Sequence, residues 1–107
     1  MIAAALMTAT PAHGSSTMQN NGNGMLSDCT NDSVFHSGVC LGYIQGIYAS
    51  VNVMMAMSEK GICYPEQVTL GQIRDVVISY LRRNPQSRHE NSVLLYMKAV
   101  TEAWRCK

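Results

Sequence analysis

The residues best suited to chemistry in this chain are four cysteines and a histidine that lies close to one of them. His36 and Cys40 are four positions apart and would share one face of a helix, where an imidazole can activate a thiol as a nucleophile. His36 with several thiolates could instead bind zinc, but the sequence has no closely spaced C-x-x-C pair. We favour a third chemistry, in which the cysteines form two disulfides; they are Cys29, Cys40, Cys63 and Cys106.

The start of the chain supports disulfide formation, because it resembles part of an export signal. Residues 1–12, MIAAALMTATPA, are apolar, uncharged and rich in small residues, and they end in an acceptable cleavage site. The basic segment that opens a complete signal peptide is missing, so we interpret residues 1–12 as a truncated leader. An exported protein meets oxidising conditions, in which small domains commonly depend on disulfides.

The composition argues against several function classes. Eight Lys and Arg residues against seven Asp and Glu residues give a net charge near zero, without the basic stripe of a nucleic-acid-binding protein. The acidic residues are scattered, with no pair placed as general acid and base, and the chain has no phosphate-binding loop and no nucleophile elbow. We therefore expect a binding protein that is not an enzyme and that holds no metal or cofactor.

The chain is predicted to consist of a leader, a linker and one domain. Residues 13–27 are rich in Gly, Asn and Ser and have no hydrophobic period, so they predict a flexible linker. Residues 28–107 then form the domain, which is large enough for one core only. Eight methionines suit an irregular core, or else an adaptable contact surface.

Residues 33–58 contain no Asp, Glu, Lys or Arg, which raises the question of a transmembrane helix. The polar residues of this segment would be costly inside a bilayer and argue against a membrane span. Apolar residues recur at the spacing of one helical face and predict a long buried helix; they are Cys40, Ile44, Ile47, Val51 and Met54. Gly38, Gly42 and Gly46 also share one side. Because each glycine destabilises a helix by about 1 kcal/mol, we expect a second helix or a partner to pack closely against them.

Two further helices follow, so the predicted class is all-α. Thr69 and Gln72 form a capping box ahead of an apolar face, and Pro85 ends this second helix. A third apolar stripe runs on to the C-terminus, starting from a capping box at Ser87 or from a later cap at residues 91–92. We expect a small, disulfide-stapled bundle of three main helices, with room for short extra helices.

The same three helices narrow the choice of disulfides. If they run up, down and up, as short connections require, the end of the first helix lies beside the end of the third. Cys63 is then close to Cys106, and Cys29 is close to Cys40. A Cys40–Cys63 bond would have to bridge about 30 Å of helix, far beyond disulfide reach. We predict Cys29–Cys40 with Cys63–Cys106, and we exclude first the pairing of Cys29 with Cys106 and of Cys40 with Cys63.

The turn between the second and third helices gathers polar and basic side chains and is stiffened by Pro85. Such a rigid loop, rich in hydrogen-bond donors, is suited to entering the cleft of a partner protein. The pattern also fits a solvated turn whose arginines complement the C-terminus of a helix, and from the residues alone we favour this second interpretation. The partner-binding candidates in the turn are Asn84, Gln86, Ser87, Arg88, His89 and Glu90.

The order of the motifs resembles the Rap/Tai immunity proteins, the antitoxins of type VI secretion amidase effectors. The segment CLGYIQG at residues 40–46 is similar to the C-x-G-Y-I-x-G helix of that family. Further segments match in order: ICYP at 62–65, VTLGQ at 68–72, Tyr80-Leu81, Asn84-Pro85, Arg88-His89 and Trp104-Arg105-Cys106. The resemblance covers residues 34–106, which is nearly the whole domain.

This resemblance implies a small, helical, disulfide-bonded periplasmic protein that binds a peptidoglycan amidase effector and blocks its catalytic cleft. It also implies that some members act as homodimers, with a protruding loop in the amidase active site. It does not identify the inhibitory loop, so the turn over residues 84–90 is a candidate. One alternative is a periplasmic acid-stress chaperone similar to HdeA, which is also small, helical and disulfide-bonded. A membrane-anchored subunit spanning the bilayer through residues 33–58 is a third class.

Overall fold

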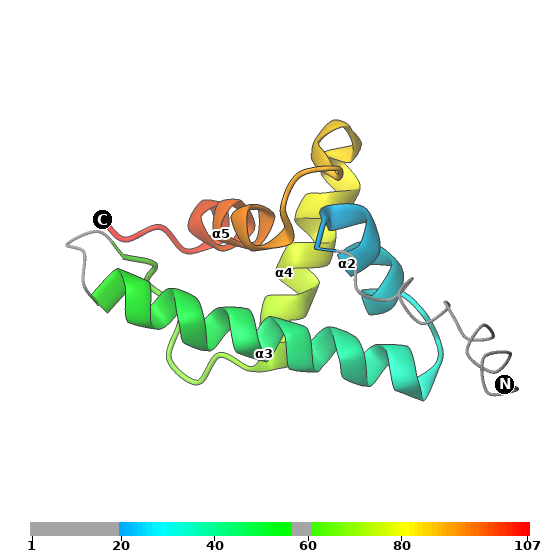
Figure 1. Cartoon of the computed structure of the whole chain (residues 1–107). Coiled ribbons are helices and arrows are strands. Elements are labelled where there is room, and N and C mark those ends of the chain that lie inside the picture. Colours follow the sequence, from blue (N-terminus) through cyan, green and yellow to red (C-terminus); the bar gives the residue numbers. More distant parts are fainter. Residues whose placement is uncertain (1–19, 57–60) are drawn as a thin grey trace, which may run out of the picture.

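The computed structural model describes residues 20–56 and 61–107, and within them the protein is all-α (Figure 1). The α-helices are α2 (Gly22–Cys29), α3 (Val34–Ala56), α4 (Leu70–Arg83) and α5 (Ser92–Ala103), and the short 3-10 helix η2 covers Pro85–Ser87. The three predicted main helices are therefore present, together with the short α2. The predicted leader over residues 1–12 lies outside the described residues.

Helix α2 corrects the end of the predicted linker over residues 13–27, because residues 22–27 are helical and partly buried. Residues 13–19 of that linker lie outside the described residues. Asn21 is the N-cap, and its Oδ1 accepts a hydrogen bond from the Gly24 N–H at 2.9 Å. Met25 is only 2% exposed and belongs to the core. A helix of eight residues with so few apolar side chains has no readable period, and its cap and its burial hold it instead.

The core is formed by one face of each helix. The predicted apolar face of α3 is confirmed except at its end, where Met54 is 49% exposed. The capping box of α4 is present, with Thr69 Oγ1 accepting from the Gln72 N–H at 3.1 Å. The buried apolar residues are Met25, Cys40, Ile44, Ile47, Val51, Ile73, Val77, Leu81, Leu95, Tyr96, Ala99 and Val100. Helix α5 begins at Ser92 with Asn91 as its cap, so of the starts that we predicted the later one is correct.

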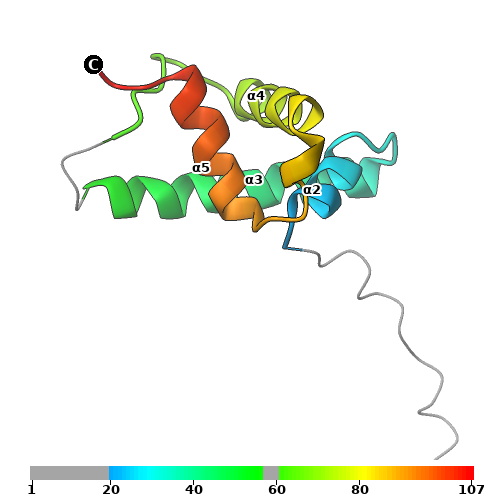
Figure 2. The ribbon, with the colours of Figure 1, turned by 90° about the horizontal axis from the view of Figure 1, so that it is seen from above.

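The helices do not lie side by side as an antiparallel bundle. Helix α4 runs steeply across α3 in Figure 1, and α5 crosses α3 steeply in Figure 2. The predicted up-down-up path is therefore wrong in its angles. The connection between α3 and α4 covers residues 57–69, which is too long to force α4 straight back along α3.

Both predicted disulfides are present. Cys29 is bonded to Cys40 and Cys63 to Cys106, with Cα–Cα distances of 4.9 and 5.0 Å. The Cys63–Cys106 bond forms despite the different helix angles, because the segment around Cys63 lies beside the C-terminal segment that follows α5. The Cys63 N–H donates to the Trp104 carbonyl at 2.8 Å, in an isolated bridge between Ile62 and Arg105.

The glycine side of α3 is open to solvent, so the expected close approach by a second helix of this chain is wrong for the described residues. A Cβ added at Gly38, Gly42 or Gly46 would meet no atom within 4 Å. The reason is that the other helices cover the opposite face of α3, on which Cys40 and Ile44 are buried. By length and composition α3 could cross a membrane, as the core helix of a soluble protein also could.

Candidate partner-binding surface

The turn from Asn84 to Asn91 stands at the top of the view in Figure 1, where α4 ends. Pro85 begins η2 and fixes the backbone there. Two further hydrogen bonds close the turn: the Ser87 N–H donates to the Asn84 carbonyl and the Glu90 N–H donates to the Ser87 carbonyl, both at 3.0 Å. The six partner-binding candidates thus lie together in one compact turn.

Arg88 fastens this turn to the end of α4. Its Nε donates to the Leu81 carbonyl at 2.7 Å, and its Nη2 donates to the Arg82 carbonyl at 3.4 Å. The last carbonyls of a helix have no partner within the helix and carry partial negative charge, so a guanidinium there is favourable. Asn84 adds a further hydrogen bond from its Nδ2 to the Tyr80 carbonyl at 2.9 Å. The interpretation of the turn's arginine as a helix C-terminal partner therefore holds for Arg88.

The start of α2 holds the turn from the other side. The Asn23 N–H donates to the Arg88 carbonyl at 2.9 Å, and the Gly22 N–H donates to the Glu90 carbonyl at 3.1 Å. Asn20, which precedes α2, accepts a further hydrogen bond at its carbonyl from the Ser92 N–H at 2.7 Å. The turn is thus fixed by main-chain hydrogen bonds from a segment that is about seventy residues away in sequence.

Two of the six candidates, Gln86 and His89, have exposed side chains, and the other four are half-buried. Gln86 Nε2 donates a 3.3 Å hydrogen bond to the Asn84 Oδ1 within the turn. Arg88 and Asn84 serve the helix end, and Glu90 pairs with Lys98 Nζ at 3.0 Å. The surface that the turn offers to a partner therefore centres on Gln86 and His89.

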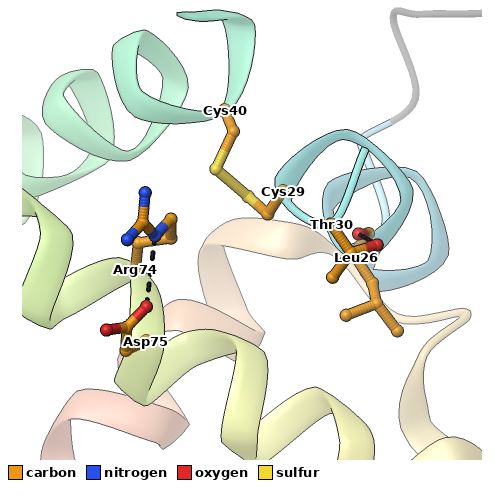
Figure 3. Close-up of a disulfide and its surroundings, with 6 residues drawn as sticks. All are labelled: Leu26, Cys29, Thr30, Cys40, Arg74 and Asp75. Carbon is orange, nitrogen blue, oxygen red and sulfur yellow. Dashed lines mark hydrogen bonds and ion pairs between the residues drawn. A yellow bond between two sulfur atoms is a disulfide. The ribbon is translucent and has the colours of Figure 1, made fainter. Parts of the chain in front are cut away.

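A basic groove lies along α4, beside the C-terminal end of α2. It has a volume of about 530 Å³ and is lined by Cys29, Thr30, Arg74, Asp75, Ile78, Ser79, Arg82 and Arg83. Figure 3 shows Arg74 paired with Asp75, at 3.2 Å, beside the disulfide of α2 and α3. Arg83 is bound to Glu102 at 2.9 Å; this hydrogen bond lowers the pKa of Glu102 and raises the pKa of Arg83. Among the described residues, Arg82 has no ion pair.

At the other end of the molecule, near the C-terminal end of α5, aromatic side chains pack against one another. The hydroxyls of Tyr64 and Tyr96 are 2.8 Å apart, and Tyr64 also packs against Tyr48 and Trp104. Burial raises the pKa of both Tyr64 and Tyr96 above the ordinary tyrosine value. The paired hydroxyls satisfy each other's hydrogen bonds and so support the packing of α5.

The residues that could have done chemistry have structural roles instead. Cys40 is buried and bonded to Cys29, so its sulfur is not a nucleophile, and His36 packs against the Phe35 ring with 5.3 Å between centroids. All four sulfurs are in disulfides and cannot act as zinc thiolates. Within residues 20–56 and 61–107, no group of three or more His, Cys, Asp or Glu side chains is placed to hold a metal.

The contribution of α2 to the site is what sequence reasoning missed. Asn21-Gly22 and Asn23-Gly24 are typical of loops, and they hid a helix start whose N–H groups face the turn. The signal that could have revealed it is Asn21 as a cap, followed by Met25 and, one further turn on, Cys29.

Comparison with known proteins gives one match. The family model described as Rap1a immunity proteins matches residues 21–106, which include α2 and the turn. No curated protein and no solved structure matches the chain.

Proposed function

Because the chain belongs to the Rap1a immunity protein family, we propose that it protects a cell by binding a peptidoglycan amidase effector of a type VI secretion system. Immunity proteins act by binding a toxic partner, which agrees with a site made of exposed polar side chains on a rigid turn. The amidase and its delivery system come from the resemblance of the motifs, such as CLGYIQG at residues 40–46, to the Rap/Tai proteins.

We place this action in the periplasm. An amidase that cleaves cell-wall peptides works there, so its inhibitor must reach the same compartment. Two disulfides support export, because such bonds form and persist in the periplasm and are rare in the cytosol. The leader-like residues 1–12 support it as well.

Inhibition on this proposal is steric. The turn would enter the catalytic cleft of the amidase, with Gln86 and His89 donating or accepting hydrogen bonds inside it. The observation that carries the proposal is that main-chain bonds and Arg88 fix the shape of the turn, while the side chains of Gln86 and His89 are exposed to solvent. A turn that is already rigid loses little entropy on binding, so more of the contact energy appears as affinity.

The test is an activity assay with the amidase encoded beside this protein. Oxidised, folded protein should abolish cleavage of peptidoglycan peptides at about one equivalent, and it should show no turnover of its own. Catalytically inactive amidase should bind with a Kd of about 1 nM or below, as expected of a dedicated inhibitor. If every co-encoded amidase stays fully active in a large excess of the protein, the proposed function is wrong.

We also propose that the open face of α3 binds a second copy of the chain. Phe35 and Val53 are each 64% exposed on this uncharged face. Consider two α3 helices packed antiparallel through this face, with the two-fold axis at the height of residue 44. Residue 44 is the midpoint between Phe35 and Val53 and also between Gly42 and Gly46. Phe35 of one copy then lies opposite Val53 of the other, and Gly42 lies opposite Gly46. Such a self-complementary face suits a symmetric dimer, and the glycines would let the two backbones approach closely.

Light scattering on the purified protein tests this dimer. We expect twice the mass of one chain, and a single-chain mass for Gly42→Leu, whose side chain would hold the helices apart. Gly71→Leu is the matched control, because Gly71 lies on α4, where an added Cβ meets only ordinary contacts. A wild-type protein that stays monomeric at high micromolar concentration would rule the dimer out.

A further inference from the structure

Helix α2 contacts the turn through its main chain. The N–H groups of Gly22 and Asn23 are free because the first N–H groups of any helix lack partners within it, and they donate to the Glu90 and Arg88 carbonyls. These bonds join α2 to both halves of the turn, on either side of His89. Replacing a side chain of the turn leaves this connection intact, whereas moving α2 breaks it.

Gly22 is the residue that makes so close an approach possible. It is buried, and a Cβ at this position would lie 2.5 Å from Leu95 Cδ1 and 3.0 Å from both Leu81 Cδ2 and the Arg88 carbonyl oxygen. Leu95 and Leu81 are themselves buried in the core, so a shift of either side chain would disturb the packing around it. The third neighbour is the backbone of the turn, so a larger residue at this position would push α2 and the turn apart.

The far end of α2 is tied to the core helix. Cys29 closes α2 and is bonded to Cys40, which is only 2% exposed on α3. Between the two ends of α2, Met25 is buried against the same core. Helix α2 is therefore a short strut, fixed to α3 by a covalent bond at one end and hydrogen-bonded to the turn at the other.

We propose that α2 is the positioning element of the inhibitory turn, with Gly22 setting its distance and the Cys29–Cys40 disulfide setting its rigidity. This inference rests on the proposed function, because it assigns to α2 the preorganisation of the surface that meets the amidase. It makes inhibition sensitive to two sites outside the turn, and it makes the Cys29–Cys40 bond a requirement for tight binding.

Gly22→Ala tests the distance, with two matched controls. Gly71→Ala is the same change on α4, where the added Cβ meets only ordinary van der Waals contacts. Val51→Ala weakens the core near the C-terminal end of α3, well beyond Cys40, and so controls for lost stability. At a temperature at which all variants are folded, we expect Gly22→Ala to raise the inhibition constant at least tenfold, by loss of preorganisation. Both controls should inhibit like the wild type.

Two paired variants test the rigidity. Cys29→Ser/Cys40→Ser frees the far end of α2, and Cys63→Ser/Cys106→Ser removes the other disulfide, which lies at the aromatic end of the molecule. We expect the first pair to raise the inhibition constant by at least tenfold and the second to change it less than threefold. Equal effects of the two pairs, or a larger effect of the second, would contradict the positioning role.

Hydrogen exchange of the free protein provides a readout that needs no amidase. In Gly22→Ala, the amides of Ser87 and Glu90 should exchange about tenfold faster, while core amides of α4 change no more than they do in Val51→Ala. If Gly22→Ala leaves the turn amides as protected as in the wild type, α2 does not position the turn. If the wild type inhibits and Gly22→Ala inhibits equally well, the inference fails and the proposed function stands; if the wild type does not inhibit, the proposed function fails.

Discussion

Arg88 donates from its Nε to the carbonyl oxygen of Leu81, at 2.7 Å, and thereby joins the turn to the last turn of α4. The contact explains why a turn with several polar side chains keeps one shape. It also shows that a positively charged side chain at a candidate binding surface can serve to stabilise the fold. The uncharged side chain of Gln86 and the side chain of His89 are exposed and available to a partner.

Arg88→Ala should therefore act mainly on stability. It leaves the end carbonyls of α4 without their charged donor, and we expect a loss of about 1–2 kcal/mol in the free energy of unfolding, measured with urea. Arg82→Ala is the control: this neighbouring side chain is exposed and has no ion pair among the described residues, so the change should stay within about 0.5 kcal/mol. Equal effects of the two substitutions would show that the helix-end contact contributes nothing.

Gln86→Ala and His89→Ala should have the opposite profile. Both side chains are exposed, so each substitution should change the free energy of unfolding by less than about 0.5 kcal/mol. Each should nevertheless raise the inhibition constant for the amidase, together by a hundredfold or about 3 kcal/mol, if the turn fills the catalytic cleft. Glu66→Gln, at an exposed position before α4, is the control and should inhibit normally. Full inhibition by the double variant would remove the turn from the binding surface.

The two disulfides should differ in how they affect stability. Cys63–Cys106 joins residues 43 apart and Cys29–Cys40 joins residues 11 apart. In the loop-entropy description the longer loop contributes about 4 kcal/mol and the shorter about 3 kcal/mol. Chemical unfolding of the two Cys→Ser pairs measures the difference. The more destabilising pair is thus expected to be the one that matters less for inhibition, which separates stability from positioning.

The tyrosine pair at the aromatic end gives a prediction about buried polar groups. Tyr64→Phe leaves the buried Tyr96 hydroxyl without its 2.8 Å partner, and we expect a loss of about 1–2 kcal/mol in unfolding free energy. Removing the second hydroxyl as well, in Tyr64→Phe/Tyr96→Phe, should restore part of that loss, because no unpaired group remains. A double variant that is less stable by the sum of the single effects would contradict this description.

The Arg83–Glu102 pair predicts a small pH dependence. The pKa of Glu102 is lowered in the folded protein by the hydrogen bond from Arg83, so its contribution to stability is present above the unfolded-state pKa and is lost as the pH falls through the folded-state pKa. Glu102→Gln should lower the melting temperature slightly at pH 7, and the difference from the wild type should vanish in acid. Both groups are exposed, so added salt should also reduce it.

Acid also separates the immunity protein from an acid-stress chaperone. A chaperone of that kind should expose apolar surface and protect many client proteins at pH 2–3. We expect this protein to bind no hydrophobic dye at that pH and to protect no clients, because among the described residues no carboxylate is buried in the core, where its protonation could open the packing. Dye binding together with client protection would favour the chaperone instead.

The sequence predicted both disulfides and the three helices that have a clear hydrophobic period or a recognisable N-cap. Thr69 with Gln72 marked the start of α4 correctly, and the apolar spacing placed Ile44 and Val51 in the core. Helix α2 was not predicted, because its glycines and asparagines favour loops by local propensity. Its helical form depends on tertiary contacts, which a local sequence pattern does not reveal. The solvent exposure of the glycine side of α3 was not predicted for a similar reason. Periodicity identifies the buried face of a helix, but it does not show how much of the helix surface its neighbours cover.

The candidate site was predictable as a segment, but the roles of its residues were not. Pro85 and the polar residues around it marked a stiff turn. Which side chains are engaged depends on distances set by folding: Arg88 donates to the end of α4, whereas His89 is exposed to solvent. The anchoring role of the Gly22 backbone depends on a packing contact with Leu95, which the sequence alone does not reveal.

The central claim is that the α4–α5 turn, held by α2, enters the catalytic cleft of the effector. A structure of the oxidised protein bound to the co-encoded amidase tests it most directly. We predict that Gln86 and His89 lie within contact distance of the catalytic residues of the amidase, with the hydrogen bonds from Gly22 and Asn23 to the turn unchanged. A complex in which that turn faces solvent would contradict the account.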